Sequence, residues 1–223
     1  RLSLRTEMIG AVGGDAFGKD LLHQLAAEGV DVSAVGVLDG VPTGTAIISV
    51  TPEDNCIVVI GGANDRVTPE LVDRHAEVIL TADVLLLQLE IPLETVRRAL
   101  QHARAAGVPA ILNPAPAREL PEDVLRGANV LTPNETEWEL LCRFAGIGDG
   151  GGSGSDEALE RNLREWERRF GNKAIVTLGA RGCAFLDGGS LQIAAAPRVQ
   201  VVDTTGAGDA FNAALAYALV RMP

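Results

Sequence analysis

The stretch Asp203-Thr-Thr-Gly-Ala-Gly-Asp209 runs directly into Ala-Phe-Asn-Ala-Ala-Leu, which has the composition of a helix. Its small residues leave the backbone amides of Gly206, Ala207 and Gly208 uncovered where that helix begins. Such amides, together with the helix dipole, favour an anion such as phosphate. Asp209 would repel that anion unless it serves as a base beside a phosphate that is being transferred. The stretch therefore predicts phosphoryl transfer, and a purely structural helix cap is the alternative interpretation of Asp209.

Upstream of this stretch, short apolar runs alternate with amphipathic segments of helical length. Alternation of this kind is typical of α/β proteins with a mostly parallel sheet covered on both faces, whose ligands gather at the carboxyl ends of the strands. The predicted strands are Met8–Val12, Val84–Leu89, Ala110–Leu112, Val130–Thr132 and Ala174–Leu178. The predicted helices are Ala16–Glu28, Pro69–Val78, Leu93–Ala106, Glu135–Phe144, Ser155–Phe170 and Asp209–Val220.

Two pairs of strand-like runs interrupt the alternation. Thr45–Thr51 and Cys56–Gly61 follow each other without a helix, and they predict a β-hairpin outside the main sheet, a candidate lid over about residues 43–62. Cys183–Leu186 and Leu191–Ala194 predict a second, peripheral hairpin. The glycine-rich segment 148–155 reads as a linker between helices, and we expect residues 1–223 to form a single domain.

Composition narrows the possible partners. The chain has 223 residues, of which 47 % are hydrophobic, and a formal net charge of −11. This acidic balance argues against nucleic acid or an anionic membrane as a partner. Cys56, Cys142 and Cys183 show no metal-binding spacing, and free thiols in a reducing compartment are the expectation. We therefore expect a cytoplasmic protein that acts on small molecules.

Two common phosphate-binding devices do not fit this chain. No G-x-x-x-x-G-K-[ST] run occurs, which excludes a P-loop. The run that starts at Gly206 begins like a dinucleotide fingerprint, but Phe211 occupies the place of the third glycine. The three histidines lie far apart in sequence on predicted helices, so they favour surface positions over a metal site.

Further short motifs follow one another along the chain. In order they are Gly13-Gly-Asp-Ala-Phe-Gly18, Thr43-Gly-Thr-Ala46, Gly61-Gly-Ala-Asn64, Gln88-Leu-Glu-Ile-Pro92, Asn113-Pro-Ala-Pro-Ala117, Thr132-Pro-Asn-Glu-Thr-Glu137 and Thr177-Leu-Gly-Ala-Arg-Gly182. Together with Asp203–Asp209, this series resembles the ribokinase-like (PfkB) sugar kinases over nearly the whole chain. The resemblance implies a three-layer α/β fold with a mostly parallel central sheet and a small β lid.

The resemblance also implies roles for individual residues. Asp209 would be the base that takes the proton from the sugar hydroxyl, and the amides of Gly206, Ala207 and Gly208 would hold the γ-phosphoryl group. Glu90 would bind sugar hydroxyls at the end of the apolar run Val84–Leu89. For Glu90, a charge at the start of the helix after Pro92 is the alternative.

The nucleotide side of the site is implied in the same way. Asn134 would contact nucleotide phosphate, and Glu137 would order the water shell of Mg²⁺, which keeps its waters readily. A local capping box that joins Asn134 and Glu137 at a helix start is compatible with these roles. The ATP-binding loop would comprise Thr177, Leu178, Gly179, Ala180, Arg181 and Gly182, together with Gly208, with a plain turn as its alternative.

Asp203 and Thr205 match positions that hold a monovalent cation, usually K⁺, in such kinases, and an ion there would fix the anion-binding loop. The implied reaction is ATP-dependent phosphorylation of D-ribose at its 5-hydroxyl, in a homodimer formed through the lid. A kinase for another sugar or a nucleoside, and a catalytically dead nucleotide-binding homologue, remain alternatives.

The chain departs from the family pattern at both ends. It begins at Arg1, after the place of an earlier strand with a sugar-binding Asp and a Gly-Gly-Lys-Gly-Ala-Asn-like segment, and it ends at Pro223. By this resemblance, residues 1–223 lack the leading strand region and the carboxyl-terminal helices that cover adenine. If a longer protein supplies these pieces, we expect an ordinary kinase. A protein limited to these residues is expected to be unstable and inactive.

Overall fold

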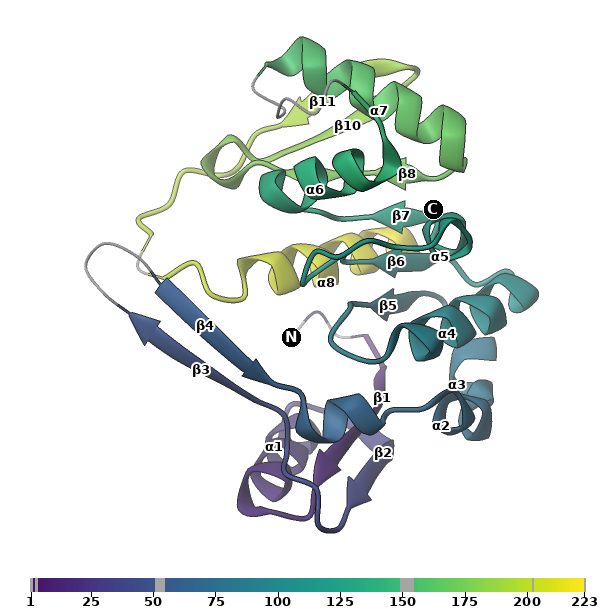
Figure 1. The fold of residues 1–223 in the computed structure, drawn as a ribbon, viewed down its shortest axis with the longest axis vertical. Coiled ribbons are helices and arrows are strands. Elements are labelled where there is room, and N and C mark those ends of the chain that lie inside the picture. The colour runs from purple at the N-terminus through teal and green to yellow at the C-terminus, as the bar shows by residue number, and fades with distance from the viewer. Residues whose placement is uncertain (1, 3, 51–54, 149–154, 202, 223) are drawn as a thin grey trace. The chain divides into compact units, whose positions relative to one another are not determined.

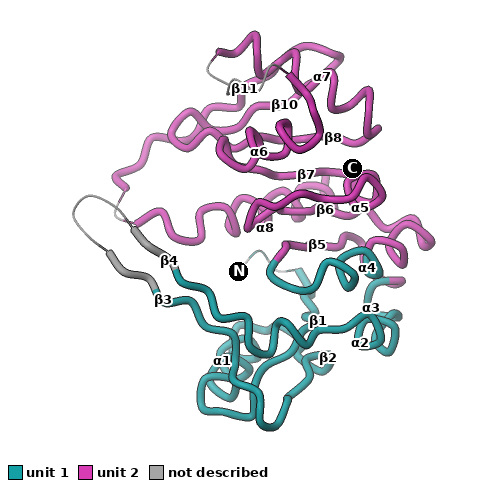
Figure 2. Tube along the Cα trace, in the orientation of Figure 1, with its two compact units in different colours: residues 1–79, 90–99 teal, residues 80–89, 100–223 magenta. Residues whose placement is uncertain are grey.

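The computed structural model describes residues 2, 4–50, 55–148, 155–201 and 203–222. The chain divides into two compact units, which Figure 2 colours separately. The first comprises residues 1–79 and 90–99, and the second comprises residues 80–89 and 100–223. Helix α4 (Leu93–Ala106) begins in the first unit and ends in the second.

The first unit is built on a β-α-β crossover. Strands β1 (Thr6–Gly13) and β2 (Val30–Leu38) pair in parallel, and α1 (Ala16–Ala27) connects them. The chain then forms the antiparallel hairpin of β3 (Thr45–Val50) and β4 (Asn55–Ile60), in which Thr45 lies opposite Ile60. This confirms the first predicted hairpin, and its turn at 51–54 lies outside the described residues.

Short helices complete this unit: η1 (Gly62–Arg66), α2 (Pro69–Arg74) and α3 (Ala76–Leu80). Its core gathers Ala11, Ala63, Val67 and Leu71 against half-buried apolar neighbours. A single helix over Pro69–Val78 is wrong, because α2 ends at its cap residue His75 and α3 starts anew.

The base of the hairpin is tied to the start of α1. Thr43 is buried, and its hydroxyl donates to Asp15 Oδ1 at 2.6 Å while accepting from the Gly13 amide at 3.0 Å. The Thr43 amide donates to Asp15 Oδ2 at 2.8 Å, and Asp15 Oδ1 also caps α1 by accepting from the Gly18 amide. These hydrogen bonds lower the pKa of Asp15, that from the Thr43 hydroxyl most strongly. One carboxylate therefore fixes both the helix start and the hairpin base.

The second unit holds the parallel sheet that the alternation predicted. Its strands β5 (Leu85–Leu87), β6 (Ala110–Leu112), β7 (Val130–Leu131) and β8 (Lys173–Ala174) pair in parallel in that order. After β8, strand β9 (Val176–Thr177) forms the edge of a three-stranded antiparallel sheet. Its other members are β10 (Cys183–Asp187) and β11 (Ser190–Ala194), which confirms the second hairpin.

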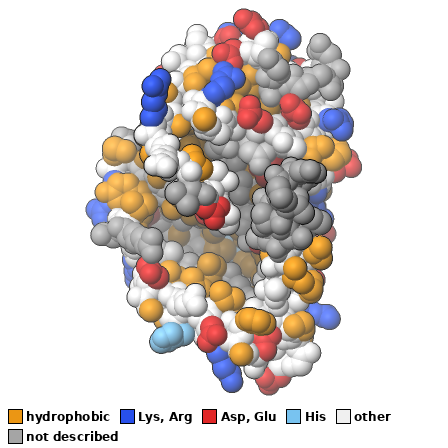
Figure 3. Space-filling view, turned by 90° about the vertical axis from the view of Figure 1, so that its left-hand side faces the viewer, with side chains coloured by type: hydrophobic (Ala, Val, Ile, Leu, Met, Phe, Trp, Pro, Cys, Tyr) orange, Lys and Arg blue, Asp and Glu red, His pale blue; other side chains and the backbone are white. Residues whose placement is uncertain are grey.

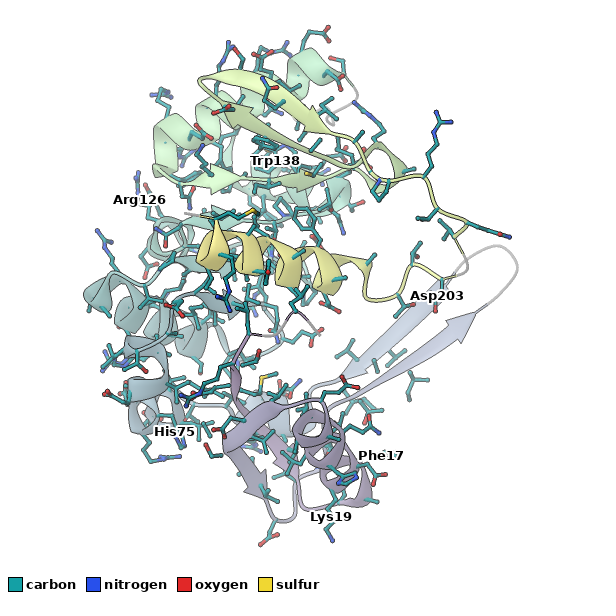
Figure 4. All side chains as sticks on the ribbon, turned by 180° about the vertical axis from the view of Figure 1, so that it is seen from behind. Phe17, Lys19, His75, Arg126, Trp138 and Asp203 are labelled. Carbon is teal, nitrogen blue, oxygen red and sulfur yellow. The ribbon has the colours of Figure 1, made fainter. Side chains whose placement is uncertain are left out.

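Helices cover both faces of this sheet. α5 (Glu122–Gly127), α6 (Glu135–Ala145) and α7 (Asp156–Phe170) accompany the strands, and α8 (Ala207–Arg221) ends the chain. Figures 1 and 4 agree that α8 lies on the face opposite α6. The core under α6 and α7 is aromatic, because the rings of Trp138 and Trp166 lie 5.1 Å apart, and Figure 4 shows Trp138 inside the unit.

No helix in the described residues is both long enough and apolar enough to span a lipid bilayer.

Candidate active site

The second unit contains a pocket of about 200 Å³ at one edge of the sheet. Segments that follow three strands and the start of α8 form its wall. The lining residues are Asn113, Ala115, Thr132, Asn134, Glu137, Thr177, Thr204, Gly206, Ala207, Gly208, Asp209, Phe211 and Asn212. The structure thus brings together the predicted base, the three predicted anion-binding residues, Asn134, Glu137 and Thr177.

Parallel strand pairing explains why these residues meet. The carboxyl ends of β6, β7 and β9 lie at one edge. Asn113 directly follows β6, Thr132 directly follows β7, and Thr177 is the last residue of β9; all three line the pocket. The Thr132 amide donates to Leu112 O at 3.1 Å, and Asn113 Nδ2 donates to Thr132 O at 3.0 Å. One step further along, Asn134 forms a parallel bridge with Thr177. The sheet therefore fixes one whole wall of the pocket.

Asn134 and Glu137 form the predicted capping box at the start of α6. Asn134 Oδ1 accepts from the Glu137 amide, and Glu137 Oε2 accepts from the Asn134 amide, both at 2.8 Å. Burial raises the pKa of Glu137, and the bond from Asn134 opposes that effect. Glu137 Oε1 is not part of the capping box. The predicted capping box is therefore confirmed, and the half-buried residue Glu137 lines the pocket.

The predicted anion-binding loop turns sharply before α8. Gly206 caps the helix with a left-handed backbone at φ 75°, which suits glycine. The Ala207 amide donates to Thr204 O at 3.1 Å, so it is engaged in a turn, whereas Gly208 and Asp209 follow it in the first turn of the helix. Asp209 is exposed, so its side chain is accessible to a ligand.

Asp203 stabilises the same loop from outside the pocket. Its Oδ1 accepts from the Thr205 amide at 2.8 Å, and this bond lowers the pKa of the carboxyl. Figure 4 shows Asp203 in the segment that leads into α8. Neither Asp203 nor Thr205 lines the pocket.

The predicted ATP loop forms a compact turn. After Thr177, η2 (Gly179–Arg181) is closed by a bond from the Leu178 amide to Gly182 O at 2.7 Å. Gly182 has φ 98°, and a Cβ there would lie 1.9 Å from Ala194 O, so only glycine fits. Within this loop, only Thr177 lines the pocket; Leu178, Gly179, Ala180, Arg181 and Gly182 do not.

Glu90 belongs to the first compact unit, outside the set of residues that lines this pocket. It is exposed and lies three residues after β5 ends at Leu87. Its assignment to the sugar remains a prediction.

Cysteine side chains and possible metal ligands occur among the described residues. Cys142 and Cys183 are free, and burial raises the pKa of Cys142 to about 12. The side chain of Cys56 lies outside the described residues. Among the described residues, no group of three or more His, Cys, Asp or Glu side chains is placed to hold a metal ion directly.

Sequence reasoning assigned no role to several residues of this wall. They are Asn113, Ala115, Thr132, Thr204, Phe211 and Asn212. Asn113 and Thr132 stand at the ends of predicted strands, and Asn212 lies three residues after Asp209 on one helix. Strand-end position and helical spacing were the signals that could have identified them.

Comparison with known proteins identifies the class. The model of the pfkB family of carbohydrate kinases matches residues 1–222, and the chain belongs to that family. It is 36 % identical over 221 residues to the ribokinase of Bacillus subtilis (strain 168), covering 99 % of this chain and 70 % of that protein. It is 33 % identical to the deoxyribokinase of Salmonella typhi, covering 99 % of this chain and 71 % of that protein.

A solved structure supports the fold. The structure of Arabidopsis thaliana ribokinase complexed with ribose and ATP superimposes with a TM-score of 0.87 at 32 % identity, covering 99 % of this chain and 71 % of that one. The chain is therefore a ribokinase-like carbohydrate kinase, a phosphotransferase, and the fold predicted from its motifs is confirmed.

The surface charge of one face can be followed in Figure 3. On the face that Figure 3 draws, acidic and basic side chains are scattered, and they form no continuous basic patch.

Proposed function

We propose that this chain transfers the γ-phosphoryl group of ATP to the 5-hydroxyl of D-ribose, giving ribose 5-phosphate and ADP. One observation carries the proposal: Asp209, the start of α8 and the Asn134–Glu137 capping box line a single pocket at the strand ends. A base, an anion site and a nucleotide-side carboxylate are the parts that phosphoryl transfer requires.

In the proposed reaction, Asp209 accepts the proton of the sugar hydroxyl as its oxygen attacks the γ-phosphorus. The new O–P bond forms while the bond from phosphorus to the ADP oxygen breaks, and ADP leaves with that electron pair. The amides at Gly206–Gly208 and the helix dipole stabilise the charge on the phosphoryl oxygens. Because the Ala207 amide donates to Thr204 O, Gly208 is the residue best placed to donate first.

Glu137 fits a hydrated Mg²⁺. Its carboxylate is half-buried and its pKa is raised by burial, so a nearby cation would relieve the cost of its charge. When bound, Mg²⁺ supplies charge neutralisation for the ATP phosphates. Asn134 and Thr177 complete this side of the pocket, and the loop from Leu178 to Gly182 is proposed to contact the remainder of the nucleotide.

Asp203 and Thr205 are proposed to hold a monovalent cation. The carboxylate of Asp203 already orients the turn through the Thr205 amide, and K⁺ bound there would stiffen the loop that carries Gly206. Its effect would be electrostatic, exerted on the anion site from outside the pocket.

Glu90 is proposed to bind sugar hydroxyls, and the β3–β4 hairpin to close over the sugar. Ile47, Val58 and Val59 of that hairpin are more than half exposed, which suits pairing with a second copy in a homodimer. Size-exclusion chromatography combined with light scattering tests that assembly, and a monomer at all concentrations would contradict it.

Deoxyribose is the second candidate acceptor, because a deoxyribokinase is among the similar proteins. The two candidates differ at the 2-hydroxyl. A site built to hydrogen-bond that hydroxyl rejects the deoxy sugar strongly.

The test is ADP release by the full-length protein with ribose, deoxyribose, fructose and adenosine, each with and without K⁺. We expect ribose to have the highest kcat/KM and Asp209→Asn to lower kcat by about 10²–10⁴-fold with a smaller change in KM. Near-full activity of Asp209→Asn would refute the base assignment. No turnover of any sugar by folded, ATP-binding protein would favour a dead homologue.

A further inference from the structure

Two buried oxygens in the wall of the pocket lack hydrogen-bond partners among the described residues. They are Thr132 Oγ1 and Asn212 Oδ1. Thr132 is 2 % exposed and Asn212 is 8 % exposed, and both line the pocket that holds Asp209. Buried polar side chains nearly always have a partner, so two such atoms in residues that line one pocket require an explanation.

Two hydrogen bonds fix the backbone of Thr132. Its amide is bonded to Leu112 O, and its carbonyl accepts from Asn113 Nδ2. Both bonds tie it to the segment that ends β6, so the sheet sets the position of its backbone. The backbone of Asn212 is likewise fixed, because it belongs to α8.

Asn212 is coupled to the proposed base through the helix. It follows Asp209 by three residues, so the two side chains lie on the same side of α8. Whatever holds Asn212 therefore helps to set the rotation of the helix turn that carries Asp209.

The surroundings define what would satisfy both oxygens. Asn212 Oδ1 is an acceptor only, the Thr132 hydroxyl is both donor and acceptor, and the carboxylates of Asp209 and Glu137 line the same pocket. The missing partner must therefore donate hydrogen bonds. A pocket of about 200 Å³ has room for water, which takes about 30 Å³ in the liquid.

We propose that Thr132 and Asn212 bind one ordered water that bridges β7 to α8 beside Asp209. The Thr132 hydroxyl donates to the water, the water donates one hydrogen to Asn212 Oδ1, and its second hydrogen faces the acceptors of the pocket. The two side chains are then positioning residues for the base. This consequence rests on the proposed function, whereas the water site itself does not.

The first test is a crystal structure of the full-length protein at high resolution without divalent metal. We expect one spherical density peak within hydrogen-bond distance of both oxygens. An empty position, or a peak that occurs only after Mg²⁺ is added, would overturn the proposal.

The second test uses near-isosteric variants. Thr132→Val and Asn212→Leu remove the two polar groups, and Thr132→Ser is the matched control that keeps the hydroxyl. If the oxygens share a water, each of the two variants lowers the melting temperature, and the double variant is less affected than the sum of the two. If the oxygens simply lack partners, removing either one raises the melting temperature, and that result would refute the bridge.

Kinetics test the positioning role. We expect Thr132→Val and Asn212→Leu to lower kcat about 10-fold, with KM for the sugar changed less than about twofold. The control Thr132→Ser should retain most of the kcat of the parent protein. Unchanged kcat in both variants would refute positioning. The density and the melting results stand even if ribose is not the substrate, so failure of the water site and failure of the proposed function are distinguishable.

Discussion

At the scale of one residue, the buried charge of Glu137 lowers the stability of the folded protein. Burial raises its pKa in the folded protein, so the folded state holds the proton more tightly than the unfolded state. That contribution to stability is complete below the unfolded pKa and is lost as pH rises through the folded pKa. The ionised carboxylate at neutral pH is therefore a cost of the fold, which a cation would relieve.

We expect Glu137→Gln to melt at a higher temperature than the parent protein at pH 7, and the difference to shrink towards pH 4. Glutamine stays uncharged and can still accept from the Asn134 amide. In the same variant, kinase activity should fall by about 10–100-fold, as for residues that orient metal-bound water. Melting curves and ADP release measure both effects. Glu135→Gln on the same helix is the control, and an equal gain in stability there would contradict the explanation.

Gly182 supports the predicted ATP loop through its backbone alone. Gly182→Ala forces a side chain into φ 98° and against Ala194 O, and we expect a loss of about 3 kcal/mol or more in the free energy of unfolding. Gly179 has φ 55°, and a Cβ added there would meet nothing within 4 Å, so Gly179→Asn should cost less than about 1 kcal/mol. Chemical denaturation compares the two, and equal losses would show that the clash is relieved by movement.

At the scale of elements, four hydrogen bonds join the hairpin base to the start of α1 through Asp15 and Thr43. The hydroxyl of Thr43 is the link between Gly13 and Asp15. We expect Thr43→Val to lower the free energy of unfolding by about 2–3 kcal/mol, because it leaves the Gly13 amide without its partner. Thr43→Ser should retain most of the stability. If valine is tolerated as well as serine, the hydroxyl does not hold this junction.

Most elements followed from periodicity and from turn residues. α4 and β6 have the predicted bounds, and the capping box marked the start of α6 correctly. β2 was not predicted, although it pairs with β1 along its length. The predicted strand Ala174–Leu178 divides into β8 and β9, because its pairing changes from β7 on one side to β10 on the other. Local pattern identifies an element, but its partners decide where it begins and ends.

At the scale of the whole molecule, the net charge of −11 repels ATP at long range. We expect KM for the Mg²⁺–ATP complex to fall, by about two- to threefold, as ionic strength rises from low salt to about 0.15 M at constant K⁺. Choline chloride is a suitable added salt. A rise in KM over this range would instead indicate a local positive field that dominates the approach of ATP.

The sequence by itself determined the local features of this protein: the glycine turn before α8, the Asn134–Glu137 capping box and the order of most strands and helices. Each depends on residues a few positions apart, so spacing reveals it. Only the tertiary structure decided that Asn113, Thr132 and Asn212 share the pocket with Asp209, and that Asp15 holds Thr43. Those contacts join segments far apart in the chain, and strand pairing and helix packing, which no local pattern records, bring them together.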